Sequence, residues 1–301
     1  MNFRLDRLAS LYLALPLLRL MPGTNEELSI PVLMYHSVTS HEQPRVHPYY
    51  RTATSPAVFA EQLKFLREHG YSTCTVAEAL EQLTAQTTGK SVVITFDDGY
   101  RNFYRDAFPL LTQYGFSATV YLPTAYIGET PNSFKGEDCL TWSEVRELRR
   151  NGIHFGSHTV THPRLRELGV SAITDELVNS KETIEQKLGC AVDSFAYPYA
   201  FPQTDVDFTK MLRDSLRAAG YKNGVCTVVG RANRHSEPLF LERLPVNSCD
   251  DRSLFEAKLA GAYDWIGTSQ YIFKKAKARF LGAPQPKLHV SNDFAWRPRA
   301  R

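Results

Sequence analysis

Two short stretches of the chain carry side chains that could activate water on a metal ion. Asp97 and Asp98 are adjacent, and His158 and His162 lie four residues apart. Adjacent carboxylates repel each other unless a cation or a shared proton relieves the repulsion. Two imidazoles and one carboxylate suit a divalent ion such as zinc and leave a coordination position open for water. The alternative is an ordinary Asp-Gly turn and a fortuitous histidine pair.

Both stretches are expected to follow strands. Residues 91–96 are mostly β-branched or aromatic, which is typical of a buried strand, and residues 153–156 predict another strand before His158. The four-residue spacing would place His158 and His162 on one face of a single helical turn, although Pro163 disfavours a longer helix. A third strand, predicted at residues 30–36, ends in His36.

Strand and helix patterns alternate in about seven units between residues 30 and 246. Thr75 and Thr141 each begin a capping box, with a glutamate three residues later. This alternation predicts a single distorted or incomplete (β/α) barrel of about seven strands, with its chemistry at the carboxyl ends of the strands. A doubly wound open sheet is the alternative, but no Gly-rich dinucleotide fingerprint supports it.

Composition excludes several classes of protein. The chain has 301 residues, enough for one large α/β domain or two small ones. A formal net charge of +3 is too small to indicate nucleic acid as the partner. Five scattered cysteines argue against a disulfide framework and against a cysteine-based zinc site.

The two ends of the chain differ from its middle. Residues 1–29 predict an amphipathic lead-in that lies on a membrane or packs on the domain; the apolar run 11–18 is far shorter than the ~20 residues that span a bilayer. This favours a cytoplasmic protein or one peripheral to the membrane, with export as the alternative. Residues 265–279 mix aromatic residues with lysines, which predicts either a basic helix on an anionic membrane or a helix that closes the barrel.

Three motifs resemble those of the NodB-type polysaccharide deacetylases, carbohydrate esterase family 4. They are Thr-Phe-Asp-Asp-Gly-Tyr at 95–100, Ser-His-Thr-Val-Thr-His-Pro at 157–163 and, more loosely, Phe-Ala-Tyr-Pro-Tyr at 195–199. The opening Pro-Val-Leu-Met-Tyr-His at 31–36 is similar to the subgroup of biofilm poly-N-acetylglucosamine deacetylases. The resemblance implies a NodB-like domain at 30–250, between the lead-in and a helical basic extension and tail at 251–301.

The resemblance also implies a reaction, in which a metal-dependent hydrolysis frees acetate from an N-acetylated sugar. Asp98, His158 and His162 would hold the metal, with zinc expected and cobalt, nickel or manganese as alternatives. Asp97 would be the general base that accepts a proton from the metal-bound water. A backbone N–H at Tyr199, in the loop that Pro198 begins, would stabilise the oxyanion.

The chain departs from the family pattern at several positions. Ala200 stands where the third motif usually ends in glycine, and Asp193 stands near the position of a base-orienting arginine. Arg243 is the substitute we expect beside the base and substrate, against the alternative of a surface arginine. The late Leu-x-His motif is missing, since His289 lies in a polar tail. We therefore expect His36 to be the catalytic acid, against the alternative of a buried structural histidine.

These features favour a polysaccharide N-deacetylase acting on an N-acetylated oligo- or polysaccharide, such as an exopolysaccharide, or on a glycolipid. A lipid-linked polymer becomes the expected substrate if both ends of the chain contact lipid. A hydrolase of another non-peptide amide bond on the same fold is the second hypothesis. The third is a non-catalytic carbohydrate-binding protein, which would have no need of Asp97 beside the metal.

Overall fold

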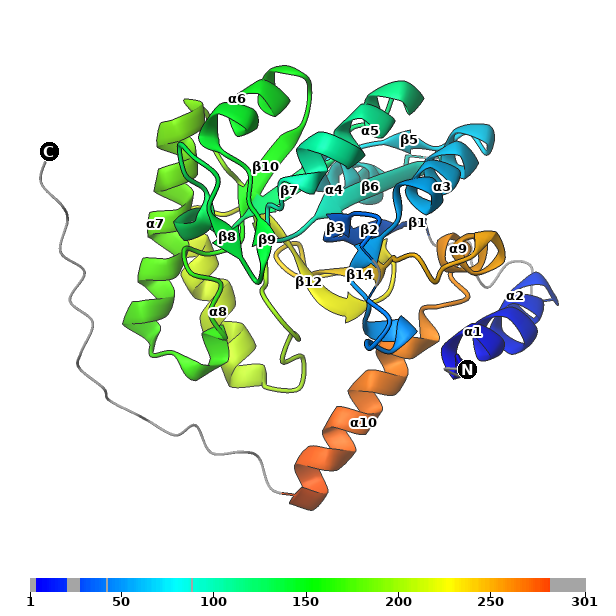
Figure 1. The fold of residues 1–301 in the computed structure, drawn as a ribbon. Helices are drawn as coiled ribbons and strands as arrows, with labels where there is room; N and C mark the ends of the chain where they lie inside the picture. Colours follow the sequence, from blue (N-terminus) through cyan, green and yellow to red (C-terminus); the bar gives the residue numbers. More distant parts are fainter. Residues whose placement is uncertain (1–3, 21–27, 42, 88, 282–301) are drawn as a thin grey trace, which may run out of the picture.

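A closed parallel barrel forms the centre of the molecule. The computed structural model describes residues 4–20, 28–41, 43–87 and 89–281, with side chains to residue 276 (Figure 1). Around the barrel the strands follow the order β2 (Val32–Tyr35), β14 (Leu241–Pro245), β12 (Asn223–Val229), β11 (Ser194–Ala196), β10 (His154–Ser157), β7 (Thr119–Leu122) and β6 (Ser91–Phe96). Pairing of β6 with β2 closes the ring. The predicted seven-stranded barrel is therefore confirmed, and the open doubly wound sheet is wrong.

Shorter strands lie at the margins of the barrel. β5 (Ser72–Thr73) pairs with the start of β6, and β1 (Ser29–Ile30) pairs with β13 (Ala232–Asn233). β3 (Ser37–Val38) pairs with β4 (Ala53–Thr54), and β8 (Ser133–Phe134) forms a hairpin with β9 (Glu137–Asp138). This hairpin interrupts the segment 123–140, which the sequence predicted only as a long loop.

Helices cover the outside of the barrel (Figure 1). They are α3 (Pro56–Glu68), α4 (Val76–Ala85), α5 (Phe108–Tyr114), α6 (Trp142–Arg150), α7 (Val170–Leu188), α8 (Val206–Ala218) and α9 (Arg252–Leu259).

 Both predicted capping boxes are confirmed. The hydroxyls of Thr75 and Thr141 accept hydrogen bonds from backbone N–H groups of α4 and α6, and the carboxylates of Glu78 and Glu144 accept the backbone N–H groups of the two threonines. Each box satisfies backbone donors that the first turn of a helix leaves unpaired.

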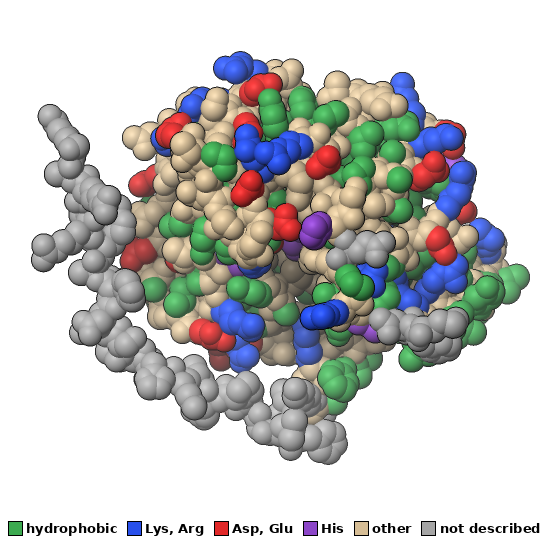
Figure 2. All heavy atoms as spheres, in the orientation of Figure 1, with side chains coloured by type: hydrophobic (Ala, Val, Ile, Leu, Met, Phe, Trp, Pro, Cys, Tyr) green, Lys and Arg blue, Asp and Glu red, His purple; other side chains and the backbone are tan. Residues whose placement is uncertain are grey.

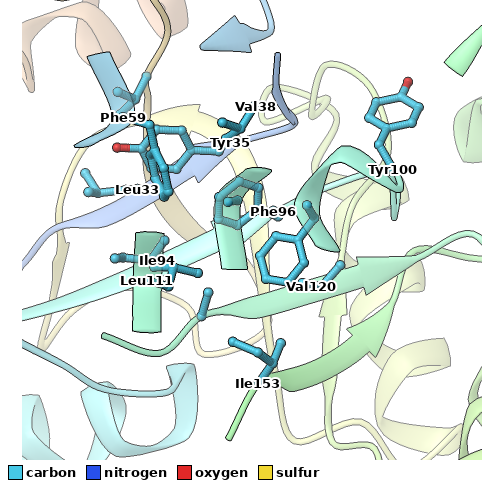
Figure 3. Packing of buried hydrophobic residues seen from close by; sticks show 14 of the residues in the cluster. Leu33, Tyr35, Val38, Phe59, Ile94, Phe96, Tyr100, Leu111, Val120 and Ile153 are labelled. Carbon is cyan, nitrogen blue, oxygen red and sulfur yellow. The ribbon is translucent and has the colours of Figure 1, made fainter. Parts of the chain in front are cut away.

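Aromatic packing beneath the carboxyl end of β6 holds that strand in place (Figure 3). All six residues of β6 are buried. The Phe96 ring stacks on Tyr35 of β2 at a centroid distance of 5.2 Å and meets Phe103 edge-on at 4.8 Å. Burying each such ring contributes about 2–3 kcal/mol, so the residues that follow Phe96 leave the barrel from a fixed point.

The N-terminal segment packs beside α9 and the start of α10 (Trp265–Leu281). The N-terminal segment comprises α1 (Leu5–Ala9), the π-helical turn η1 (Ser10–Ala14) and α2 (Leu15–Leu20), beside α9 (Arg252–Leu259) in Figure 1. The Tyr263 hydroxyl donates to Asp6 at 2.6 Å, and the Trp265 indole of α10 donates to Ser10 at 3.0 Å. None of the described helices combines the length and the apolar character needed to cross a bilayer. His289 and the rest of the predicted tail lie outside the described residues.

Candidate metal centre

The turn after β6 delivers two buried carboxylates to the mouth of the barrel. Asp97 and Asp98 are only 2% and 3% exposed. Asp98 and Gly99 both have left-handed backbone, with φ of 68° and 60°. A Cβ at position 99 would lie 3.0 Å from Cδ2 of Leu122, and the residue would have to adopt a positive φ, so this turn favours glycine. A left-handed aspartate is a strained conformation of the kind that folded proteins concentrate at functional sites.

The loop after β10 brings His158 and His162 to the same place. The expected helical turn is wrong, because the loop is irregular and both Thr159 and His162 have left-handed backbone, with φ of 68° and 56°. The Thr159 hydroxyl accepts the N–H of His162 at 3.0 Å, which fixes the second histidine relative to the first. Sequence spacing therefore identified the pair but not the backbone that holds it.

Asp98, His158 and His162 converge tightly enough to hold a metal ion. One nitrogen or oxygen atom from each lies within 4.8 Å of the others, and all three residues are buried. Oδ1 of Asp98 lies 3.2 Å from Nε2 of His162 and 3.7 Å from Nε2 of His158. This buried oxygen has no hydrogen-bond partner among the described residues, which is costly unless a cation satisfies it. The donor set thus fits a divalent metal.

The tautomer of His158 suits it for coordination. Its Nδ1–H donates to the carbonyl of Ala196 at 2.8 Å, which leaves the lone pair of Nε2 free. Burial lowers the pKa of His158 to about 4, so the imidazole is neutral at pH 7. A neutral imidazole held by such a hydrogen bond is the usual form of a metal-binding histidine.

Asp97 takes no part in this cluster and is held by Arg243. The guanidinium donates from both terminal nitrogens to the two carboxylate oxygens, at 2.8 and 2.7 Å. Arg243 is 1% exposed, so the alternative of a surface arginine is wrong. Burial of Asp97 opposes its ionisation, but the attraction of Arg243 outweighs it and lowers the pKa to about 2. Asp97 is therefore an oriented, ionised carboxylate beside the metal centre.

His36 follows β2 and reaches the same carboxylate. Its Nε2 lies 3.9 Å from Oδ2 of Asp97, and its side chain is 22% exposed. Burial lowers the pKa of His36, while Asp97 and Asp98 partly oppose that effect. The position is suited to proton exchange at the mouth of the barrel, and the catalytic role of His36 stays a prediction.

The loop after β11 closes the other side of the site. Tyr199 has left-handed backbone with φ of 59°, is 41% exposed, and its ring lies 4.6 Å from that of His162. Pro198 before it is buried, and the Thr227 hydroxyl donates to the Tyr199 carbonyl at 2.9 Å. Ala200, where the family pattern has glycine, therefore follows a turn whose left-handed residue is Tyr199.

Two further residues interact with Asp98, and sequence reasoning did not assign either a role. Lys135 donates to Oδ2 of Asp98 at 3.3 Å from the tip of the β8–β9 hairpin. Burial raises the pKa of Tyr100, and the negative charge of Asp98 raises it further. The available sequence signal for the hairpin was the Lys135-Gly136 pair between two strand-like dipeptides. In the structure both residues have positive φ, as a tight hairpin turn requires.

Comparison with known proteins yields consistent matches. The polysaccharide deacetylase family model matches residues 84–224. Over 239 residues the chain is 31% identical to YxkH of Bacillus subtilis, which is named for that family; the match covers 78% of this chain and 77% of YxkH. Poly-beta-1,6-N-acetyl-D-glucosamine N-deacetylase of Staphylococcus aureus is 26% identical over 205 residues, covering 65% of this chain and 68% of the enzyme.

Two solved structures share the architecture at 25% identity. Streptococcus pyogenes deacetylase PplD, solved in complex with acetate, superposes with a TM-score of 0.67 over 77% of this chain and 99% of its own. IcaB from Ammonifex degensii superposes with a TM-score of 0.63 over 77% of this chain and 97% of its own. The residues that the family model matches include Asp97, Asp98, His158 and His162.

Proposed function

Because the chain belongs to the polysaccharide deacetylase family, we propose that it hydrolyses the acetamido groups of N-acetylated sugars in a polysaccharide or glycolipid. The observation that supports this most strongly is the pairing of a buried Asp/His/His cluster with a separate carboxylate, Asp97, that Arg243 orients. A carbohydrate-binding protein would not need such a carboxylate. An amide hydrolase needs one to accept a proton from water.

Asp98, His158 and His162 are the proposed metal ligands. Two imidazoles and a carboxylate suit zinc, and cobalt, nickel and manganese are the alternatives to test. When bound, such an ion supplies a Lewis acid for the acetyl carbonyl and acidifies a coordinated water. Lys135 would limit the movement of the Asp98 carboxylate, because its ammonium donates to Oδ2.

The proton transfers are assigned to residues that flank this cluster. Asp97 accepts a proton from the attacking water, and Arg243 keeps the carboxylate aligned for that transfer. The carbon–nitrogen bond of the acetamido group then breaks, and His36 donates a proton to the leaving nitrogen. Acetate and the free amino sugar are the products. The backbone N–H of Tyr199 donates no hydrogen bond to another group in the described part of the chain, so it is available to stabilise the oxyanion.

The proposed polymer is an N-acetylglucosamine exopolysaccharide. The support is the match to the Staphylococcus aureus enzymes, whose name specifies poly-beta-1,6-N-acetyl-D-glucosamine. A lipid-linked form of the polymer is a further candidate, which depends on contact between the protein and a membrane.

We also propose that the protein contacts a membrane peripherally. The N-terminal segment exposes Leu5, Tyr12, Leu13, Leu17 and Leu20, and α10 exposes Tyr271, Ile272 and Phe273. The hydrogen bond between Trp265 and Ser10 holds these two elements together. Flotation of the full-length protein with anionic liposomes tests the contact, and we expect replacement of Leu13, Ile272 and Phe273 by serine to reduce it. Absence of flotation by the unmodified chain would exclude it.

Acetate release tests the catalytic proposal. Purified protein is treated with a chelator, supplied with zinc, cobalt, nickel or manganese, and incubated with N-acetylglucosamine oligomers. We expect release only after metal is restored, and none from Asp98→Asn. Release that persists in the chelated protein would refute the metal-dependent mechanism. Bound metal without release would point instead to a different acyl substrate.

A further inference from the structure

A lysine from a tight hairpin lies over the proposed metal centre. Lys135 and Gly136 form the turn between β8 and β9, with φ of 53° and 85°. The Lys135 ammonium lies 3.3 Å from Oδ2 of Asp98, 4.6 Å from the ring centroid of Phe134 and 5.4 Å from that of Tyr199. The short turn and these aromatic contacts restrict where the ammonium can go.

A second cation approaches the same tyrosine from another loop. Arg164 directly follows the motif that carries His158 and His162, and its side chain is exposed. Its Cζ lies 4.9 Å from the centroid of the Tyr199 ring. Lys135 and Arg164 thus contact one aromatic side chain at the mouth of the barrel. We call these two residues the cationic rim. Figure 2 shows one face of the molecule, with histidine side chains near its centre and both basic and acidic side chains around them.

Apart from the bond between Lys135 and Asp98, the cationic rim has no carboxylate partner in the described part of the chain, unlike two other basic residues. Arg166 pairs with Asp205 at 2.8 Å, and Lys187 pairs with Glu129 at 2.7 Å. Within the part of the chain that the structure describes, Arg164 forms no ion pair, and Lys135 pairs only with Asp98.

The acidic residue Glu176 forms no ion pair with the rim in the described part of the chain. Its carboxylate accepts hydrogen bonds from the N–H groups of Val160 and Thr161 at 2.7 and 2.9 Å, and from the Thr161 hydroxyl at 2.6 Å. Those bonds hold Glu176 against the loop that carries His158 and His162.

Metal binding would leave the positive charge of the cationic rim still less balanced by carboxylates. A divalent ion on Asp98 competes with Lys135 for that carboxylate, while Arg243 already offsets the charge of Asp97. The mouth of the barrel would then carry excess positive charge beside an exposed aromatic ring. A neutral glycan offers nothing to balance that charge, whereas a carboxylate or phosphate does, and arginine binds either through paired hydrogen bonds.

We propose that the cationic rim is a subsite for an anionic group of the substrate, a phosphate or carboxylate attached near the acetamido group that is hydrolysed. This inference rests on the proposed deacetylase function and narrows its substrate class to anionic N-acetylated glycans. Tyr199 contributes an apolar face on which the sugar ring packs between the two cations. Lys135 and Arg164 thereby select the substrate, and Asp97 and His36 carry out the proton transfers.

The experiment compares three small acceptors that differ in charge. They are methyl N-acetylglucosaminide, which is neutral, N-acetylglucosamine 1-phosphate and N-acetylmuramic acid, a carboxylate. For the metal-loaded full-length protein, kcat/KM is measured by acetate release and Kd by calorimetry. We expect at least one anionic probe to have a kcat/KM about tenfold or more higher than that of the neutral probe and a Kd about tenfold or more lower, with the preference falling as salt increases.

Substitutions test whether the preference for anionic probes comes from the cationic rim. Lys135→Met and Arg164→Met should each reduce the ratio of anionic to neutral kcat/KM, the double variant should abolish the preference, and Lys135→Arg should retain it. Arg166→Met and Lys187→Met remove equal charge at residues that have their own carboxylate partners, and they should leave the ratio unchanged. An equal loss in these controls would indicate a general field effect and would overturn the proposal.

The binding measurement separates failure of the subsite from failure of the function. Acetate release without any charge preference would overturn the subsite and leave the deacetylase function standing. Preferential binding of an anionic probe, lost in the double variant, would support the subsite even if no probe were hydrolysed. Equal Kd values for all three probes would overturn it regardless of activity.

Discussion

The guanidinium of Arg243 donates hydrogen bonds to both carboxylate oxygens of Asp97, although the two residues lie 146 positions apart in the chain. Arg243 comes from β14 and Asp97 from the end of β6, and β2 lies between these strands in the barrel. The same guanidinium donates to the carbonyl of Cys226 at 2.9 Å. Closure of the barrel therefore supplies the proposed base with an orienting partner that no local motif contains.

Arg243→Lys tests this positioning role. A lysine keeps the charge but cannot donate two parallel hydrogen bonds, so the carboxylate loses its alignment. We expect kcat/KM to fall by about 10- to 100-fold, because a small misplacement of a reacting group costs that much. The pH profile of kcat/KM separates positioning from general damage: its acidic limb should move to higher pH because the pKa of Asp97 rises. A lower rate with an unchanged profile and metal content would contradict positioning.

Acid sensitivity provides a second test of the same pair. The folded pKa of Asp97, about 2, lies below its ordinary value of 3.8, so the folded state favours the ionised form. The resulting stabilisation is present above the ordinary pKa and is lost as pH falls toward 2. The difference corresponds to about 2 kcal/mol in the free energy of unfolding. In urea titrations of metal-free protein, the stability advantage over Asp97→Asn should shrink between pH 5 and pH 2. A constant difference across that range would contradict the linkage.

Metal binding should stabilise the folded protein. A ligand that binds only the folded state stabilises it by about 2.7 kcal/mol at one hundred times its Kd. We expect added zinc to raise the Tm of the chelated protein, and Asp98→Asn to lose most of that increase. Asp175→Asn removes an exposed carboxylate on α7 and is the matched control. An equal increase in Asp98→Asn would place the metal elsewhere.

His36→Gln distinguishes an acid catalyst from a structural histidine. Loss of a general acid lowers turnover by about 10²- to 10⁴-fold, so kcat should fall in that range with little change in KM. The basic limb of the pH profile should disappear with it. His69→Gln, at the C-terminal cap of α3, changes a histidine outside the site and should preserve both. If His36→Gln lowered thermal stability without changing the pH profile, the structural alternative would be favoured.

Local sequence patterns predicted more of the fold than of the site. Alternating strands and helices predicted the barrel, and capping boxes placed the starts of α4 and α6 correctly. The irregular loop that carries His158 and His162 escaped prediction, because its left-handed residues are not glycines and tertiary contacts hold them. The burial of Arg243 also depends on strands that are distant in sequence. Position 135 shows the same limit: residues 123–140 were predicted only as a long loop, and the approach of Lys135 to Asp98 depends on the folded hairpin.

Gly99→Ala tests whether the strained turn after Asp98 supports the metal centre. The added methyl would meet side-chain carbons of Leu122 at 3.0 Å and Ile127 at 3.2 Å, in addition to the cost of a positive φ. Gly115→Ala is a matched control, because φ there is 70° but no atom lies within 4 Å of the new Cβ. Both variants should lose about 1 kcal/mol of stability from backbone strain, with a larger loss at position 99. Only Gly99→Ala should weaken metal binding, as measured by calorimetry, because the clash moves Asp98 relative to His158. Equal metal affinity in the two variants would show that the turn is not required to position the ligand.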